Sequence, residues 1–442
     1  DAAYSDMWNQ RVYQKIISTQ YLDKVRLVPV SRNLIESNHE HPAVISESRL
    51  KLKNVVSNVL RLLGKFHHPD VVFLGATFAP VALVRLNIAL GQFPSLKFLH
   101  ALPAATVTNS WPNETELRSA VQLAFHENSD FERFIKSVLV SDLPRCVLEG
   151  YSMLRKHANT IPIRPRAIVT GSSHWDDASA KTWIAEKSAS GTAFIVLEHG
   201  GSLPPYKELF DFEPAISDVR VSWFTPYHRK HVQLPPPRMA GRYGTVFQIR
   251  RLLSPKKYCS LIANENSLWV HRAHFYPMAY QWSDSFSMVL KLFDKLNADV
   301  RDHFRIKPYP VSQGWKTAQR FADELGMEAL HTERSLERVY AMSKVIVCSY
   351  PETTFSEAMA SSVPTILMFP ERFYELNPIA NPLLEILRRA KIAFNDPGEA
   401  ASHLNTIWQN TDAWWMSHET VFARKEFYRQ ALNLDRRWLS KW

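Results

Sequence analysis

The chain has 442 residues, with 53 lysines and arginines against 43 aspartates and glutamates, a formal net charge of +10. Its 45% hydrophobic content excludes a disordered polyelectrolyte and predicts two packed domains. Neither a G-x-G-x-x-G motif nor a P-loop motif is present, so those two modes of nucleotide binding are disfavoured. The three cysteines, Cys146, Cys259 and Cys348, form no C-x-x-C pair, which predicts a reducing compartment without disulfides or structural zinc.

The longest apolar stretch, residues 71–90, is interrupted by Pro80, Arg85 and Asn87, so we do not expect it to span a membrane. The sequence shows no N-terminal secretion signal. The positive charge favours a partner that carries phosphates or carboxylates, and a mildly basic surface without a function is the alternative.

Residues 1–45 are predicted to be an extension, and residues 46–250 a first α/β domain. In this domain we expect a helix at 50–63, strands at 71–74, 167–170 and 194–197, and a crossover helix at 178–189 that completes a β-α-β unit. The proline-rich segment 235–242 interrupts all periodicity and indicates a domain boundary.

A second alternation of strands and helices predicts another α/β domain over residues 251–410. The expected strands are 267–271, 304–307, 345–348 and 365–369, and the expected helices are 286–296, 315–325, 336–342 and 355–360. Short apolar strands alternating with helices predict a parallel sheet covered on both faces. Two such domains would face a cleft at the carboxyl ends of their strands, where open α/β sheets bind ligands.

Hydroxyl side chains follow the strand at 345–348. Ser349, Thr353 and Thr354 precede or begin a helix, whose first backbone N–H groups favour an anion, so the turn outlines a phosphate site. Glu357, in the following helix, is a further candidate donor-binding residue. The alternative is a capping box formed by Thr354 and Glu357.

A cation ends the preceding strand. Lys307, followed by Pro308 and Tyr309, is predicted to face the same cleft and to neutralise a phosphate. A solvated lysine at a strand end is the alternative.

Candidate acid and base groups lie in the first domain. The strand at 194–197 ends in Glu198 and His199, and two glycines, Gly200 and Gly201, let the backbone approach a ligand closely. The alternative is a turn with a surface histidine. Asp218 is the preferred carboxylate for a nucleophile or base, and Glu149 is a further carboxylate candidate.

Metal-dependent chemistry loses support, because the sequence contains no H-E-x-x-H and no D-x-D motif. We therefore predict no metal site and no cofactor.

The tail, residues 424–442, is predicted to be basic and helical within a C-terminal helical segment, 411–442. Phe427, Ala431, Leu434 and Trp438 would share one face of a helix. That face could contact a membrane surface as an interfacial helix, or it could dock across the two domains.

The order and spacing of these motifs over residues 140–440 resemble a group of bacterial surface-polysaccharide transferases. The resemblance is carried by residues 167–170, 198–201, 217–218, 307–310, 314–315, 350–354, 357–358 and 414–415. The group is distantly similar to GT-B transferases that use cytidine-nucleotide donors: Kdo transferases, bacterial sialyltransferases and teichoic-acid glycerophosphotransferases. In those relatives a Lys/His-Pro element and a Ser/Thr-rich turn hold the donor, which implies donor binding by Lys307, Pro308, Ser349, Thr353 and Thr354. Several relatives carry His-Pro where this chain has Lys307-Pro308.

The resemblance implies a GT-B fold and a metal-independent transfer of Kdo or a related acidic 2-keto sugar from a CMP donor to a bacterial surface glycan. The expected partners are a nucleotide sugar and a glycan or lipid-linked acceptor, without nucleic acid. The expected location is the cytoplasm, at the inner membrane face if the tail contacts lipid. The alternatives are a transferase or epimerase that uses another nucleotide sugar, and a binding protein without catalysis.

Overall fold

The computed structural model describes Ile17 and residues 69–92, 115–123, 129–200, 212–266, 268, 277–278, 280–435 and 437–442. The chain divides into two compact units, and the second contains Thr77–Leu90 and Glu198–Trp442. The predicted helix at 50–63, Gly201, nearly all of the extension at 1–45 and nearly all of the strand at 267–271 lie outside the described residues.

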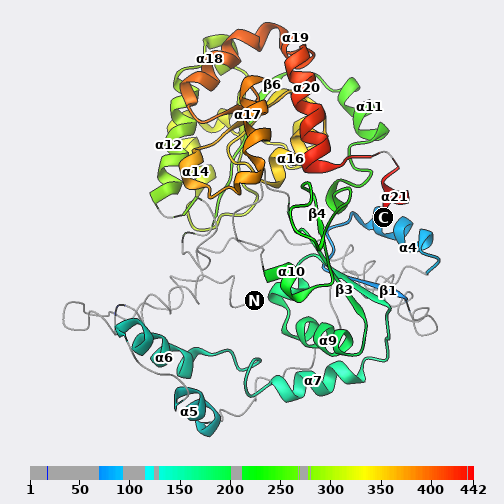
Figure 1. The fold of residues 1–442 in the computed structure, drawn as a ribbon. Helices are drawn as coiled ribbons and strands as arrows, with labels where there is room; N and C mark the ends of the chain where they lie inside the picture. The colour runs from blue at the N-terminus through cyan, green and yellow to red at the C-terminus, as the bar shows by residue number, and fades with distance from the viewer. Residues whose placement is uncertain are drawn as a thin grey trace, which may run out of the picture. The chain divides into compact units, whose positions relative to one another are not determined.

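The first unit is a parallel β-α-β arrangement. Strands β1 (Val71–Leu74), β2 (Ala167–Thr170) and β3 (Ala193–Leu197) pair in parallel. The crossover helix α9 (Ala178–Ala189) begins at an Asp177 cap and packs beside α7 (Tyr151–Thr160), as Figure 1 shows. The predicted strands and crossover helix of this unit are confirmed. The remaining helices are α5 (Thr115–Leu123), α6 (Asp130–Asp142) and α8 (Ser173–Asp176).

The first sheet has the strand order β1-β2-β3-β4-β5. Strands β4 (Val219–Ser222) and β5 (His231–Gln233) belong to the second unit and pair in parallel. Helices α10 (Phe212–Ile216) and α11 (Thr245–Leu253) flank these strands in sequence, and α4 (Pro80–Ala89) follows β1.

The second sheet lies wholly in the second unit and has the order β10-β9-β8-β6-β7. Its strands are β6 (Tyr258–Ile262), β7 (Phe304–Lys307), β8 (Ser343–Cys348), β9 (Thr365–Met368) and β10 (Ala393–Phe394), all paired in parallel. The predicted strand β7 is confirmed to the residue. The sequence did not predict β6, because Tyr-Cys-Ser-Leu-Ile carries a serine in its centre and follows two lysines.

Alternating side chains of β8 build two cores on opposite faces of this sheet. Ile346 and Cys348 join one hydrophobic cluster, and Val345 and Val347 join the other. All four side chains are fully buried, as the helix-covered parallel sheet requires. The covering helices are α12 (Tyr280–Asp294), α13 (Ala298–Arg301), α14 (Thr317–Leu325), α15 (Leu336–Met342), α16 (Thr353–Ala360), α17 (Asn381–Arg389) and α18 (Pro397–Ile407).

The tail is not one continuous helix. Helices α19 (Thr411–Trp415) and α20 (His418–Phe427) lead into a π-helical turn at Tyr428–Leu432, and the left-handed residue Asn433 separates this turn from α21 (Trp438–Lys441). Phe427, Ala431 and Trp438 are buried. The apolar face therefore packs inside the protein, which favours the docking alternative over the interfacial helix.

Hydrogen bonds return the tail to the segments that follow β4 and β5. The backbone N–H of Thr225 donates to the carbonyl of Gln430 at 2.6 Å, and the Trp442 indole donates to the carbonyl of Pro235 at 3.0 Å. The C-terminal helices thus cross back toward the first sheet, as predicted. Within the described part of the chain, no helix has both the length and the apolar character needed to span a membrane.

Removing the Phe427 ring tests the packing of the tail. Phe427→Ala should lower the free energy of unfolding by about 3–5 kcal/mol, because a fully buried aromatic side chain is replaced by a cavity. Leu434→Ala, at a site that is 37% exposed, is the matched control and should cost less than half as much. Urea denaturation followed by tryptophan fluorescence measures both, and equal losses would contradict this account of the tail.

Candidate functional site

The strand order of the second sheet reverses beside β6. The chain passes from β6 to β7 on one side and then to β8 on the other, so β6 and β8 are neighbours whose following segments diverge. In open α/β sheets this switch point opens a crevice at the carboxyl ends of the two strands. Ser349 joins the strands here, since its backbone N–H and its hydroxyl both donate to the carbonyl of Ile262, at 3.3 and 3.0 Å.

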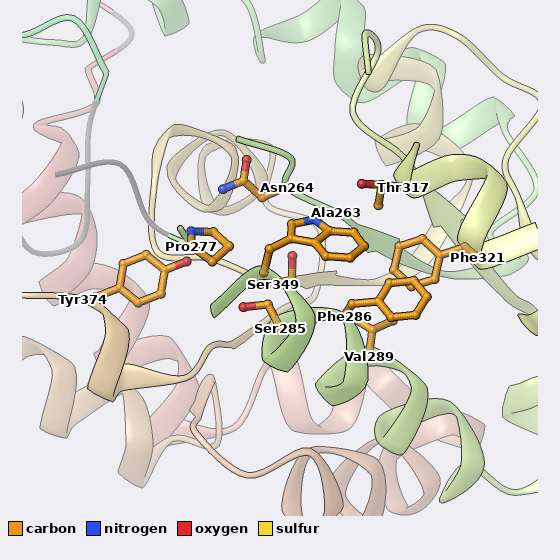
Figure 2. Close-up of a pocket in the computed structure, with 11 residues that line it drawn as sticks. Ala263, Asn264, Pro277, Ser285, Phe286, Val289, Thr317, Phe321, Ser349 and Tyr374 are labelled. Carbon is orange, nitrogen blue, oxygen red and sulfur yellow. The ribbon is translucent and has the colours of Figure 1, made fainter. Parts of the chain in front are cut away.

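A pocket occupies this crevice (Figure 2). Ala263 and Asn264 follow β6, Ser349 follows β8, and helices α12 and α14 supply further walls. In Figure 2, Tyr374 and Pro277 lie at one end and Phe286 and Phe321 at the other. The lining thus combines aromatic faces with hydroxyl and amide groups, around a cavity of about 20 Å³ that has room for about one water molecule.

Two hydroxyls that line the pocket are buried without a hydrogen-bond partner among the described residues. They are Ser285 Oγ and Thr317 Oγ1, and Thr317 is only 2% exposed. Buried polar atoms normally have a partner, so a polar ligand or water would satisfy them.

Stacked aromatic rings make one wall of the pocket rigid. Trp315 stacks on Trp282 with centroids 4.5 Å apart and planes at 12°, and Trp282 stacks on Phe286 at 5.2 Å. Phe286 in turn packs on Phe321 at 4.6 Å. The stack fixes the segment between β7 and α14 against α12.

Glu265 organises the loop after β7. This carboxylate, 4% exposed, accepts hydrogen bonds from the Ser312 hydroxyl at 3.0 Å, the Gln313 N–H at 2.6 Å and the Trp315 N–H at 3.3 Å. The sequence analysis did not single out Glu265, because β6 was not predicted and Glu265 therefore had no strand end before it. Had β6 been predicted, Glu265 would have been recognised as a carboxylate that follows the carboxyl end of a strand.

Lys307 ends β7 at the same edge of the sheet, where its carbonyl accepts the N–H of Ala263 at 3.0 Å. Its ammonium is half-buried, and burial lowers the pKa of Lys307 while Glu333 opposes the shift. Burial and the neighbouring Lys307 also lower the pKa of His331 to about 4. Pro308 and the partly exposed Tyr309 follow, leading into the loop held by Glu265.

Helix α16 begins at Thr353 without a side-chain cap. Glu352 occupies the N-cap position, so the predicted capping box of Thr354 and Glu357 is wrong. Thr354 instead shares a hydrogen bond with the hydroxyl of Tyr350. The first turn of α16 thus places two threonine side chains at the positive end of an uncapped helix, where an anion is favoured.

Glu357 is buried and forms ion pairs with other residues of the protein. Its carboxylate is 3% exposed and lies 2.8 Å from Arg238 Nε and 3.2 Å from Arg242 Nη1, and Tyr243 donates to it at 3.5 Å. Burial and Glu357 together raise the pKa of Tyr243 well above its usual range. Glu357, predicted to bind the donor, ties the segment between β5 and α11 to α16 and so positions the helix.

The residues after β3 approach the start of α16. A Cβ atom added to Gly200 would lie 2.4 Å from Thr353 Oγ1, so any larger residue would displace the Thr353 hydroxyl. His199, immediately before it, is exposed, whereas Glu198 is buried. The structure therefore brings Gly200 and Thr353 together within the second unit, and His199 is the residue next to Gly200 in the chain.

Glu198 has a structural environment. It accepts a hydrogen bond from the Trp223 N–H at 2.6 Å and from the Ser222 hydroxyl at 3.0 Å. Burial raises the pKa of Glu198, and the nearby Arg220 opposes the shift. Glu198 thus fixes the backbone from which His199 projects.

A buried ion pair lies behind this carboxylate and was not predicted. Arg220 Nε is 2.6 Å from Glu213 Oε2, and both side chains are 1% exposed. Burial, with Arg220 nearby, lowers the pKa of His231 to about 4, so that ring is neutral. Glu213 and Arg220 belong to short elements that contain no recognisable motif. The sequence therefore did not predict that they form a buried ion pair.

Asp218 and Glu149 lie elsewhere. Asp218 precedes the amino end of β4, the opposite end of that strand from Ser222 and its partner Glu198. Glu149 follows no strand and pairs with Arg118 at 2.6 Å, and this hydrogen bond lowers the pKa of Glu149. Neither carboxylate stands at the carboxyl edge where the other candidates gather. The described residues contain no group of three potential metal ligands.

Several solved structures are similar to this chain in fold. A glycosyltransferase from Rickettsia africae ESF-5 shares 12% identity at a TM-score of 0.44, covering 85% of this chain and 96% of that chain. The wall teichoic acid polymerase TagF, in a variant soaked with CDPG, shares 10% identity at a TM-score of 0.39, covering 87% and 91%. WaaG, a glycosyltransferase involved in lipopolysaccharide biosynthesis, shares 9% identity at a TM-score of 0.36, covering 83% and 96%.

No curated protein matches this sequence. The family model described as "LIC12162 family transferase" matches residues 2–442, which is nearly the whole chain. The chain belongs to the LIC12162 family of transferases.

Proposed function

We propose that this transferase is a metal-independent glycosyltransferase of the GT-B type, which moves Kdo or a related acidic 2-keto sugar from a CMP donor to a bacterial surface glycan. The observation that carries the proposal is the approach of Gly200 to the start of α16, whose first turn has no side-chain cap, with the exposed His199 next to Gly200 in the chain. An anion site and a candidate base thus belong to one unit.

The nucleotide is proposed to bind along the carboxyl edge of the second sheet. Thr353 and Thr354 would donate to the phosphate at the start of α16, and Lys307 would balance its charge. Ser349 and Tyr309 would contact the remainder of the nucleotide. The cavity itself is about 20 Å³, room for about one water molecule, so the nucleoside is proposed to lie over its mouth beside the aromatic wall.

His199 is proposed as the base. Its exposed imidazole would take the proton from an acceptor hydroxyl, whose oxygen then attacks the anomeric carbon while CMP leaves with the bonding electrons. Glu198 would act as a positioning residue through Trp223 and Ser222. The placement of Asp218 at the amino end of β4 moves our choice away from that residue.

Removing the two threonine hydroxyls should weaken nucleotide binding. Thr353→Ala/Thr354→Ala is expected to reduce the affinity for CMP by about 1–3 kcal/mol, because two donors to a charged phosphate are lost. Calorimetry measures this, and the exposed Thr406→Ala on α18 is the matched control. Unchanged CMP affinity in a folded double variant would remove α16 from the site, and selective stabilisation of the wild type by UDP or GDP instead of CMP would replace the proposed donor.

Replacing the proposed base should affect turnover rather than binding. His199→Ala is expected to lower kcat by about a hundred- to ten-thousand-fold with little change in CMP affinity, because a positioned base contributes that much. Asp218→Asn should retain most of the wild-type kcat. The proposal fails if Asp218→Asn loses as much activity as His199→Ala.

Chelation should leave the rate unchanged. Since the sequence has no D-x-D motif, we expect equal transfer rates with EDTA and with added Mg²⁺ or Mn²⁺. Activity that disappears in EDTA and returns with either ion would contradict the metal-independent mechanism.

A further inference from the structure

Helix α11 (Thr245–Leu253) carries apolar side chains on two faces. Its inner face is anchored by the buried Phe247 and by Arg251, which donates to the carbonyls of Tyr340 and Ser343 at 3.1 and 3.0 Å. The helix is therefore fixed in place by its own side chains. The side chains on its outer face do not contribute to this anchoring.

The outer face of α11 is strongly exposed and apolar. Val246 is 74% exposed, Ile249 53%, Leu252 79% and Leu253 80%. Their spacing of three, three and one residues puts them along one side of the helix. We call these four residues the α11 face.

The chain around α11 is rich in cations, and the exposed ones nearest in sequence follow the helix. Residues 219–264 contain nine lysines and arginines and no aspartate or glutamate, but Arg220 and Arg251 are buried, and Arg238 and Arg242 pair with Glu357. Lys256 and Lys257 lie three and four residues after the end of the helix and are exposed. Arg250 is 43% exposed and lies 3.3 Å from Glu337 of the neighbouring α15.

We infer that the α11 face binds the surface of a membrane that contains anionic lipids. Apolar side chains on one side of a helix, flanked by lysines, are the features that let a helix lie in the headgroup region, with cations attracted to lipid phosphates. A helix of nine residues is about 14 Å long and so can lie on a bilayer but cannot cross it.

A second copy of this chain fits the α11 face less well. Stable protein interfaces bury about 800 Å² on each partner and involve about 20–30 residues a side, whereas the α11 face has four residues. Like charges around the face would also repel in a symmetric dimer. An anionic lipid surface can bury the apolar side chains and also pair its phosphates with the cations.

Lipid binding would place the proposed glycosyl transfer next to a lipid-linked acceptor, but the inference does not depend on the donor. Helix α11 lies between β5 and β6 in sequence, and Arg238 and Arg242 just before it hold Glu357 of α16. Membrane attachment would thus act close to the segment that positions α16.

The test is sedimentation of the purified chain with vesicles. We expect binding to vesicles of phosphatidylglycerol and phosphatidylethanolamine in equal parts, and little binding to phosphatidylcholine alone. Leu252→Ser/Leu253→Ser should lose at least about tenfold in bound fraction. Lys256→Gln/Lys257→Gln should weaken the binding and reduce its sensitivity to salt.

Met327→Ser, at an apolar residue that is 69% exposed on another element, is the matched control and should bind like the wild type. CMP binding by Leu252→Ser/Leu253→Ser should be unchanged, which separates this inference from the proposed function. Equal vesicle binding by the wild type and Leu252→Ser/Leu253→Ser would overturn it. So would a dimer in light scattering that this double variant converts to a monomer without any lipid binding by the wild type.

Discussion

The pairing of β6 with both β7 and β8 is the constraint on which the candidate site depends. Because the chain leaves β6 toward one side and returns to the other, the segments after β6 and β8 must separate at their carboxyl ends. Ser349 bridges the two strands through the carbonyl of Ile262, and the pocket opens directly beyond this bridge. Both cores of the second sheet pack on the same strands, so the position of the crevice is fixed by the most deeply buried part of the unit.

Buried carboxylates hold the loops around this crevice. Glu265 organises the segment after β7, Glu357 ties α16 to Arg238 and Arg242, and Glu198 holds the backbone before His199. Each of the three accepts hydrogen bonds from a different loop or linker. Such groups are costly to bury without partners, and the partners here are the segments that carry the candidate site residues.

The sequence predicted much of this architecture and less of the site. Strands with continuous apolar residues, such as β1 and β8, were recognisable, and α15 was predicted to the residue. Strand β6 was missed because its central Ser260 interrupts the apolar run, and Glu265 was missed with it. Asp218 remains an untested candidate, and the structure adds that it stands at the amino end of β4.

The tail also shows what a sequence pattern leaves undecided. Its apolar spacing marked Phe427, Ala431 and Trp438, all of which are buried, but spacing alone does not distinguish a buried face from a lipid-facing one. In α11, by contrast, exposure separates the two faces of one short helix. Only packing decides between these outcomes, because both helices mix apolar and basic residues.

A crystal structure of the chain with bound CMP tests the central claim most directly. We predict electron density for the phosphate at Thr353 and Thr354, the nucleoside over the mouth of the pocket lined by Ser349 and Trp282, and the His199 imidazole facing the phosphate. CMP bound away from the carboxyl ends of β6 and β8 would contradict the account.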